Sequence, residues 1–239
     1  MMKKQTRHPF DIPVEGEERY RNMEELIACA KACVEKKEWM MAKNILDEAV
    51  KANCLPARLE LARLLSNTPE LEIPGKERYR RAEQLYREVL NTLEIPDSMV
   101  AEAALGLSGL LGDFQARPVG CLAMLLMAKR YGARVSEREV EQVSRKITRM
   151  DVNSFGGNCR DAYELGVELA MTGKSVRTAE LFLREATLSE DPVVAGYAYL
   201  ELSELYRRDM DKYPEHRKEA ARCAAMAARK GCPEYFSFS

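Results

Sequence analysis

The chain has 239 residues, of which 46% are hydrophobic and 31% are charged. This apolar content is enough for a buried core, and the charge content is typical of amphipathic helices with solvated outer faces. The 37 Lys and Arg residues balance the 38 Asp and Glu residues, which gives no reason to expect nucleic acid or an anionic membrane as a partner. The basic first residues lack the apolar run of a signal peptide, and no run of about 18 apolar residues occurs. We therefore expect a cytoplasmic protein that does not span a membrane.

The chain contains seven cysteines, and most of them lie within helical apolar patterns. A secreted disulfide framework would place its cysteines in loops and in even numbers. Reduced thiols that serve as small core residues are the simpler interpretation. The cysteine pattern therefore also favours the cytoplasm.

Helices are predicted from residue 20 to residue 231, after a polar, proline-interrupted segment at residues 1–19 that we expect to be flexible. Apolar residues recur three and four positions apart, as in the stretch from Leu26 to Val34. No segment alternates polar residues with β-branched and aromatic ones. Short stretches rich in Pro, Gly, Asp and Asn separate the helices, near residues 68–69, 73–75, 95–97, 112–113, 153–158 and 191–192. These observations predict an all-α protein.

The helices fall into pairs, and the second helix of each pair carries a small anchor residue followed three positions later by a larger one. In most pairs another small residue follows seven positions after the anchor. The anchors are Ala42, Ala82, Cys121, Ala179 and Ala220, with spacings of 40, 39, 58 and 41 residues. About five repeats of one helix pair are therefore expected.

The first helices carry a matching signature, in which leucine precedes a small residue. The instances are Ala57-x3-Leu61-Ala62, Ala101-x3-Leu105-Gly106, Leu165-Gly166 and Ala198-x3-Leu202-Ser203. Two antiparallel helices pack closely where a small residue on one faces a bulky residue on the other. Glycine costs about 1 kcal/mol in a helix interior, so a packing role is expected for it. We predict buried contacts between paired helices at Gly106, Gly166, Ala179 and Ala220, and partly buried aromatic rings at Trp39 and Tyr79.

These signatures resemble the Sel-one-like repeat, a relative of the tetratricopeptide repeat. Its pattern reads Ala-x3-Leu-Gly-x2-Tyr, a loop, and then Ala-x2-aromatic-x3-Ala-Ala-x2-Gly. The best match runs from Ala198 to Gly231. The resemblance implies an α-solenoid, a right-handed superhelix of antiparallel helix pairs, over residues 20–231. It also implies the family's usual role of holding protein complexes together.

The chain departs from this pattern in three places. The loop motif Gly-x-Gly-Val is absent, and the loop from Asn67 to Gly75 is long. The 58-residue spacing contains an additional amphipathic helix at about residues 136–150, for which Ser136 and Glu139 form a predicted capping box. We expect the stack of helices to bend or break near residues 134–158.

The C-terminal segment, residues 232–239, contains three aromatic residues. Such residues need burial at some surface. The segment either covers the exposed end of the last helix pair or docks into a partner or a second copy of the chain.

Residues with catalytic or metal-binding chemistry are few. The only histidines are His8 and His216, and a zinc site needs three or four ligands. Cys29 and Cys33 share one helix face but no second pair of cysteines accompanies them. Phe155 to Cys159 resembles a nucleophile loop without a base, so we expect Asn158 to cap a helix there. We expect no metal, no cofactor and no enzymatic activity.

Three functions follow from this pattern as hypotheses. The first is a scaffold or adaptor that binds a peptide or a protein on the concave face of the solenoid. The second is a chaperone for an unfolded or secreted client, which should show an apolar groove. The third is a cysteine-dependent enzyme, which should bury a thiol of low pKa in a cleft.

The resemblance also predicts the binding surface, because the concave face of tetratricopeptide repeats is lined by first helices. We count the exposed positions of this face from the small residue of each first helix, which is Ala30, Ala62, Gly166 or Ser203. The residues predicted in this way are Lys31, Arg63, Asn67, Arg160, Tyr163, Tyr197, Glu204, Arg207 and Arg208. Arg and Tyr are common anchors of protein contacts, and the four first-helix arginines suggest a partly acidic partner. The same count in the third repeat gives only apolar residues, which are either covered or form a hydrophobic floor. They are Val100, Ala103, Leu107, Leu110 and Leu111.

Overall fold

The computed structural model of the chain describes residues 16–148, 158–173, 176–211 and 213–232. Of these residues 79% are helical, in eleven α-helices and one π-helical turn, and the described ranges contain no strand. The predicted all-α class is therefore confirmed. None of the helices in these ranges is long and apolar enough to cross a membrane. The chain forms two compact units, residues 1–106 and 107–239, and each unit has its own core.

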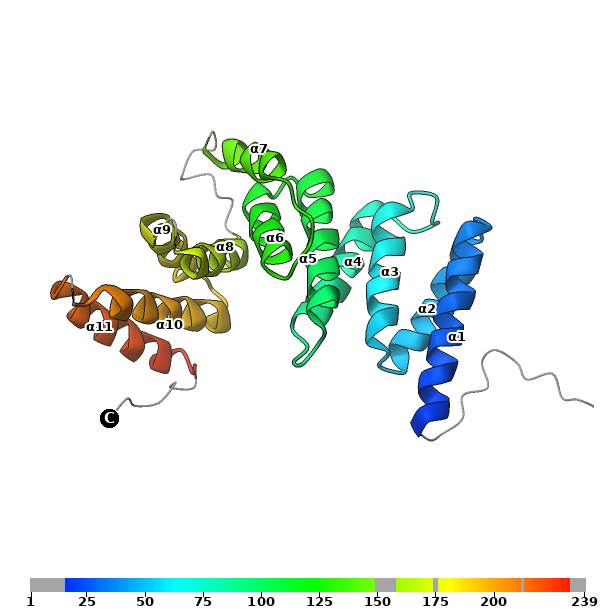
Figure 1. Cartoon of the computed structure of the whole chain (residues 1–239), viewed down its shortest axis with the longest axis horizontal. Coiled ribbons are helices and arrows are strands. Elements are labelled where there is room, and N and C mark those ends of the chain that lie inside the picture. The colour runs from blue at the N-terminus through cyan, green and yellow to red at the C-terminus, as the bar shows by residue number, and fades with distance from the viewer. Residues whose placement is uncertain (1–15, 149–157, 174–175, 212, 233–239) are drawn as a thin grey trace, which may run out of the picture. The chain divides into compact units, whose positions relative to one another are not determined.

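The first unit contains four helices and most of a fifth (Figure 1). They are α1 (Gly16–Glu35), α2 (Trp39–Lys51), α3 (Leu55–Asn67), α4 (Gly75–Leu90) and the part of α5 (Asp97–Gly109) up to Gly106. Helices α1 and α2 form one hairpin and α3 and α4 another, and α2 packs on α3. The first helix thus begins within the segment predicted to be flexible, whose residues 1–15 lie outside the described ranges.

The second unit contains six helices after the π-helical turn η1 (Leu110–Phe114). They are α6 (Pro118–Arg130), α7 (Glu137–Thr148), α8 (Cys159–Thr172), α9 (Val176–Ala186), α10 (Pro192–Asp209) and α11 (Glu215–Arg229). Helix pairs α8–α9 and α10–α11 form hairpins, α9 and α10 pack on each other, and α6 packs on both α7 and α8. In Figure 1 these helices run from green to red.

Helix starts follow the sequence signals. Helix α7 is the additional helix, and its capping box is confirmed: the Ser136 backbone N–H donates to Glu139 at 2.8 Å, and the Glu139 N–H donates to the Ser136 hydroxyl at 3.2 Å. Asn158 caps α8 through a hydrogen bond from the Asp161 N–H at 3.2 Å. Asp191 caps α10 in the same way. Side chains thus satisfy N–H groups that the helices leave open.

The repeat signature coincides with the core. All five anchors, Ala42, Ala82, Cys121, Ala179 and Ala220, are buried. A Cβ added to Gly106 would lie 2.5 Å from the Tyr86 hydroxyl, and one added to Gly166 would lie 2.7 Å from Leu183 Cγ. The predicted burial is therefore confirmed at Gly166, Ala179 and Ala220, and Gly166 contacts Leu183 of its paired helix α9. The prediction is wrong for Gly106, which is half-buried and contacts Tyr86 of α4, a helix of the preceding pair. Trp39 and Tyr79 are half-buried, as expected.

One signature residue behaves differently. Leu105 corresponds to the buried residues Leu61, Leu165 and Leu202 of the other first helices, but it is 43% exposed. The buried face of α5 includes Ala101, Ala104 and Ser108 instead. This spacing of three and seven residues turns Leu105 outward.

The apolar positions counted in the third repeat are mostly covered. Ala103 in the first unit and Leu107, Leu110 and Leu111 in the second are all at most 1% exposed, and Val100 is half-buried. These side chains therefore belong to the cores of the two units and do not form an exposed apolar surface.

Overpacking at the anchors should destabilise the second unit. Ala179→Leu and Ala220→Leu each insert three carbon atoms where no space exists, and each should lower the free energy of unfolding by about 1–3 kcal/mol. The matched control is Ala221→Leu, since Ala221 neighbours Ala220 but is exposed, and its effect should stay within about 0.5 kcal/mol. Urea unfolding followed by circular dichroism measures the difference. Equal stabilities of Ala220→Leu and Ala221→Leu would contradict the packing role.

Candidate protein-binding surface

In the first unit, a row of ion pairs joins three first helices. Lys31 Nζ of α1 lies 3.0 Å from Glu60 Oε1 of α3, and Arg63 Nη1 lies 3.4 Å from the same oxygen. Arg63 Nη2 also contacts Glu102 Oε2 of α5 at 2.9 Å. The predicted residues Lys31 and Arg63 thus lie on one surface and share a carboxylate. Asn67 follows Arg63 by about one turn at the end of α3 and is exposed.

The row is partly exposed, which limits its contribution to stability. The side chains of Lys31, Arg63 and Glu102 keep 58%, 39% and 51% of their exposure, whereas Glu60 keeps 21%. Ion pairs of this kind contribute at most about 1 kcal/mol each, because water and salt screen them. Charged groups of a partner could therefore replace these ion pairs at a small cost in free energy.

In the second unit, two tyrosines of adjacent first helices face each other. The ring centroids of Tyr163 on α8 and Tyr197 on α10 are 6.5 Å apart and the rings are tilted by 47°. Tyr163 is half-buried and Tyr197 is 38% exposed. Burial raises the pKa of Tyr163 well above its usual range, and the nearby Glu201 adds to this. The Tyr163 hydroxyl is therefore neutral at physiological pH.

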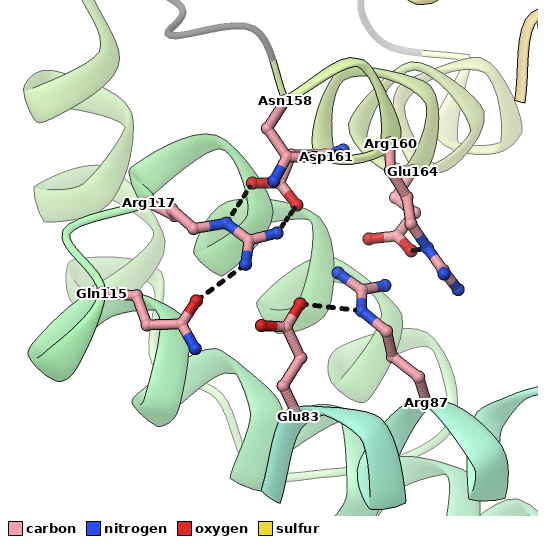
Figure 2. Close-up of polar contacts among 8 residues, drawn as sticks. All are labelled: Glu83, Arg87, Gln115, Arg117, Asn158, Arg160, Asp161 and Glu164. Carbon is pink, nitrogen blue, oxygen red and sulfur yellow. Dashed lines mark hydrogen bonds and ion pairs between the residues drawn. The ribbon is translucent and has the colours of Figure 1, made fainter. Parts of the chain in front are cut away.

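Charged residues flank the tyrosines, and most pair within their own helix. Arg160 Nε contacts Glu164 Oε1 at 3.1 Å (Figure 2), and Arg207 Nη1 contacts Glu204 Oε1 at 3.0 Å. Arg208 donates a hydrogen bond to the Ala170 carbonyl at 3.2 Å, which ties α10 to α8. The α8 and α10 positions predicted from the sequence thus include a tyrosine pair, two intrahelical ion pairs and one arginine bound to a backbone oxygen.

Glu201 was not predicted as part of this surface, yet it lies beside Tyr163 and Arg208. Burial raises its pKa; Arg208 opposes this effect and Glu204 adds to it. The sequence carried a usable signal: Glu60, Glu164 and Glu201 each stand two residues before the small residue of their first helix. Counting this further position would have found all three.

Glu201→Gln should stabilise the protein at pH 7. A carboxyl whose pKa is raised by folding favours the folded state below its unfolded pKa of about 4.3, and this contribution is lost as the pH rises through the folded pKa. The substituted amide cannot ionise, so the melting temperature should exceed that of the wild type at pH 7, and the gap should close toward pH 4. Melting curves at several pH values measure it. Glu190→Gln makes the same charge change at an exposed site and should leave the melting temperature at pH 7 nearly unchanged.

Two ion pairs with buried carboxylates on α8 join this helix to α6 and to the residue that precedes α6. In the sequence, the additional helix α7 lies between α6 and α8. Arg117 donates to Asp161 through Nε at 2.9 Å and through Nη2 at 2.7 Å, while its Nη1 donates to Gln115 at 2.7 Å (Figure 2). A Cβ on Gly120 would lie 2.7 Å from the Asp161 carboxyl carbon. The glycine therefore allows α6 to approach the buried carboxylate closely.

The second pair lies further along the same two helices. Arg130 Nε and Nη2 donate to the two oxygens of Glu168 at 3.1 and 2.8 Å, and Glu168 is 1% exposed. Asp161 and Glu168 are seven residues apart and lie on the same buried face of α8 as Leu165.

Figure 2 also shows an ion pair of the first unit, in which Arg87 Nε of α4 lies 3.0 Å from Glu83 Oε1.

The side chains considered for metal binding or catalysis do not form a cluster in the described residues. The described residues contain no cluster of three or more His, Cys, Asp or Glu side chains suited to a metal ion. Burial raises the pKa of the Cys121 thiol to about 11, and burial also raises the pKa of Cys223. Cys29 is exposed and Cys33 buried, while His216 lies between the rings of Tyr206 and Tyr213. His8 and residues 155–157 lie outside the described ranges.

No protein-family model, no curated protein and no solved structure matches the chain.

Proposed function

We propose that this chain is a non-enzymatic adaptor or scaffold that binds a protein or peptide through the surface of its first helices. The observation that carries the proposal is the Tyr163–Tyr197 pair on adjacent first helices, with Arg160 and Arg208 on the same two helices. Tyrosine and arginine are enriched at the centres of protein interfaces, because both bury apolar area and keep polar donors.

We also propose that the chain belongs to the Sel-one-like and tetratricopeptide-like class, with its helix pairs forming a right-handed superhelix. The burial of all five anchors and the hairpins within each unit support this assignment. Seven free cysteines support a cytoplasmic location.

The surface favours an adaptor over a chaperone. A chaperone for unfolded clients would need a mainly apolar first-helix surface, whereas Lys31, Glu60, Arg63 and Glu102 make that of the first unit strongly charged. A cysteine enzyme would need a thiol of lowered pKa, and burial raises the pKa of Cys121 and Cys223.

The proposed partner is a partly acidic peptide or protein surface. It meets Arg63, Arg160, Arg207 and Arg208, and it has to displace the carboxylates that three of them contact in the chain itself. Partner carboxylates would gain charge-assisted hydrogen bonds in a desolvated interface, which are stronger than the exposed pairs they replace. The test begins with affinity capture of the tagged protein from its own cell extract, followed by measurement of binding with the purified partner.

Charge reversal at Arg160 and Arg207 should weaken that binding. The double variant Arg160→Glu/Arg207→Glu should lose about tenfold or more in affinity, equal to about 1.4 kcal/mol, and the loss should shrink at high salt. The control reverses two arginines that are exposed on α9 and α11, Arg177 and Arg217, with the same change in net charge. Titration calorimetry at two salt concentrations measures both. Unchanged affinity of the first variant at low salt would place the partner elsewhere.

A further inference from the structure

A pocket of about 710 Å³ lies in the second unit, on the face of α10 opposite Tyr197. Tyr199, Leu202 and Tyr206 form its α10 wall, and they recur at three and seven residues on one helix face. Helices α9 and α11, the turn after α9 and Ile147 of α7 supply the other walls. Its size is typical of sites that hold a ligand or several large side chains.

The pocket continues into an uncovered apolar stripe on α9 and the turn that follows it. Ala179, Leu183 and Ala186 fill the core side of α9, yet Leu181 and Leu188, which line the pocket, are 66% and 71% exposed. These two leucines are seven residues apart and therefore point in similar directions. Adjacent exposed leucines beside an apolar pocket indicate a docking surface.

Two of the three charged side chains that line the pocket are basic. Arg184 and Arg222 are 49% and 64% exposed, and Glu185 is the acidic lining residue. Each arginine pairs with a glutamate of its own helix outside the lining, Glu180 at 2.8 Å and Glu219 at 2.7 Å, which an acidic group of an occupant would displace. Arg229 follows Arg222 by seven residues and lies on the same side of α11. The complementary occupant therefore combines aromatic or aliphatic side chains with an acidic group.

We propose that residues 233–239 of the same chain, Pro-Glu-Tyr-Phe-Ser-Phe-Ser, occupy this pocket. The segment has the required chemistry: Glu234 is followed by Tyr235, Phe236 and Phe238. In this arrangement the aromatic rings cover Leu181 and Leu188, and Glu234 meets the arginines of α11. The proposal does not depend on the function proposed above, which uses the other side of α10.

The segment is long enough to reach the pocket. It starts after Cys232, which is buried against Gly196 of α10. A Cβ added to Gly196 would lie 2.7 Å from the Cys232 sulfur. Cys223 lines the pocket and precedes Cys232 by nine residues, most of them helical, so the two are separated by about 13 Å along the helix axis. Seven extended residues span up to about 24 Å. The left-handed turn at Gly231, with a φ of 81°, lets the chain leave the helix direction there.

The test uses full-length chains and a labelled peptide of residues 233–239 with an amidated end. In an open variant, Tyr235→Ser/Phe236→Ser/Phe238→Ser, the pocket loses its own occupant while the chain keeps its length. Fluorescence anisotropy should then show saturable binding of the peptide. The wild type should bind the peptide at least about tenfold more weakly, because a tethered segment competes at an effective concentration on the order of millimolar.

Site variants in the open background locate the binding. Leu181→Glu should weaken peptide binding by about tenfold or more, since it places a buried charge against the rings. Leu93→Glu is the matched control, because Leu93 is 87% exposed and lies in the first unit, and it should leave the affinity unchanged. Three results would overturn the proposal: no saturable binding to the open variant, equal binding to wild type and open variant, or a wild-type dimer that the open variant lacks. The last would place the segment in a second copy of the chain.

Discussion

Arg130→Ala should lower the free energy of unfolding by about 3–5 kcal/mol, because it leaves the Glu168 carboxylate buried without its cation. Glu168 is 1% exposed and accepts both of its ion-pair hydrogen bonds from Arg130. The matched control is the neighbouring Lys129→Ala. Lys129 pairs with Glu137 at the surface, where both side chains are largely exposed, and its loss should cost at most about 1 kcal/mol.

A double variant separates the cost of an orphaned charge from the contribution of the pair. Arg130→Met/Glu168→Leu replaces both partners with apolar side chains and should recover most of the lost stability. Urea unfolding followed by circular dichroism measures all four proteins. A loss below about 1 kcal/mol for Arg130→Ala would mean that α6 and α8 do not depend on this pair.

Tyr86→Ala should cost about 3–5 kcal/mol in the first unit, since it empties a site that is 1% exposed. The same change should reverse the effect of Gly106→Ala. In the wild type the added methyl group meets the Tyr86 ring and should destabilise the protein by about 1–3 kcal/mol. Without the ring, alanine should stabilise α5 by up to about 1 kcal/mol, since it is the better helix former.

A double-mutant cycle tests this reversal, because the two residues contact each other directly and their effects should not add. Hydrogen exchange of the α3 and α4 amides localises the change to the first unit. If Gly106→Ala had the same effect with and without Tyr86, steric contact with the Tyr86 ring would not be the reason for a small residue at position 106.

The helix pairs could be predicted because their signals are local in the sequence. Each second helix carries its anchor, such as Ala179, at the same position of the repeat, and the two residues of the Ser136–Glu139 capping box are three positions apart. Leu105 departs from the other first-helix leucines because the alanines around it set the buried face of α5.

The candidate surface was predictable only in part. Counting found Tyr163 and Tyr197, since the repeat fixes which first-helix positions are neighbours. It did not find that Arg63 contacts Glu102, because the two are 39 residues apart and their contact depends on how helices pack. The buried carboxylates Asp161 and Glu168 were missed for the same reason: their arginines lie 44 and 38 residues away.

Hydroxyl-radical footprinting of the complex with a captured partner shows whether the partner covers the first-helix surface. Tyr197 is 38% exposed on the proposed surface, and Tyr213, which is 49% exposed in the α10–α11 connection, serves as the internal control. Binding should slow oxidation of Tyr197 severalfold and leave that of Tyr213 unchanged. Oxidation of Tyr197 at the same rate in the free and the bound protein, with protection elsewhere in the chain, would contradict the proposed binding surface.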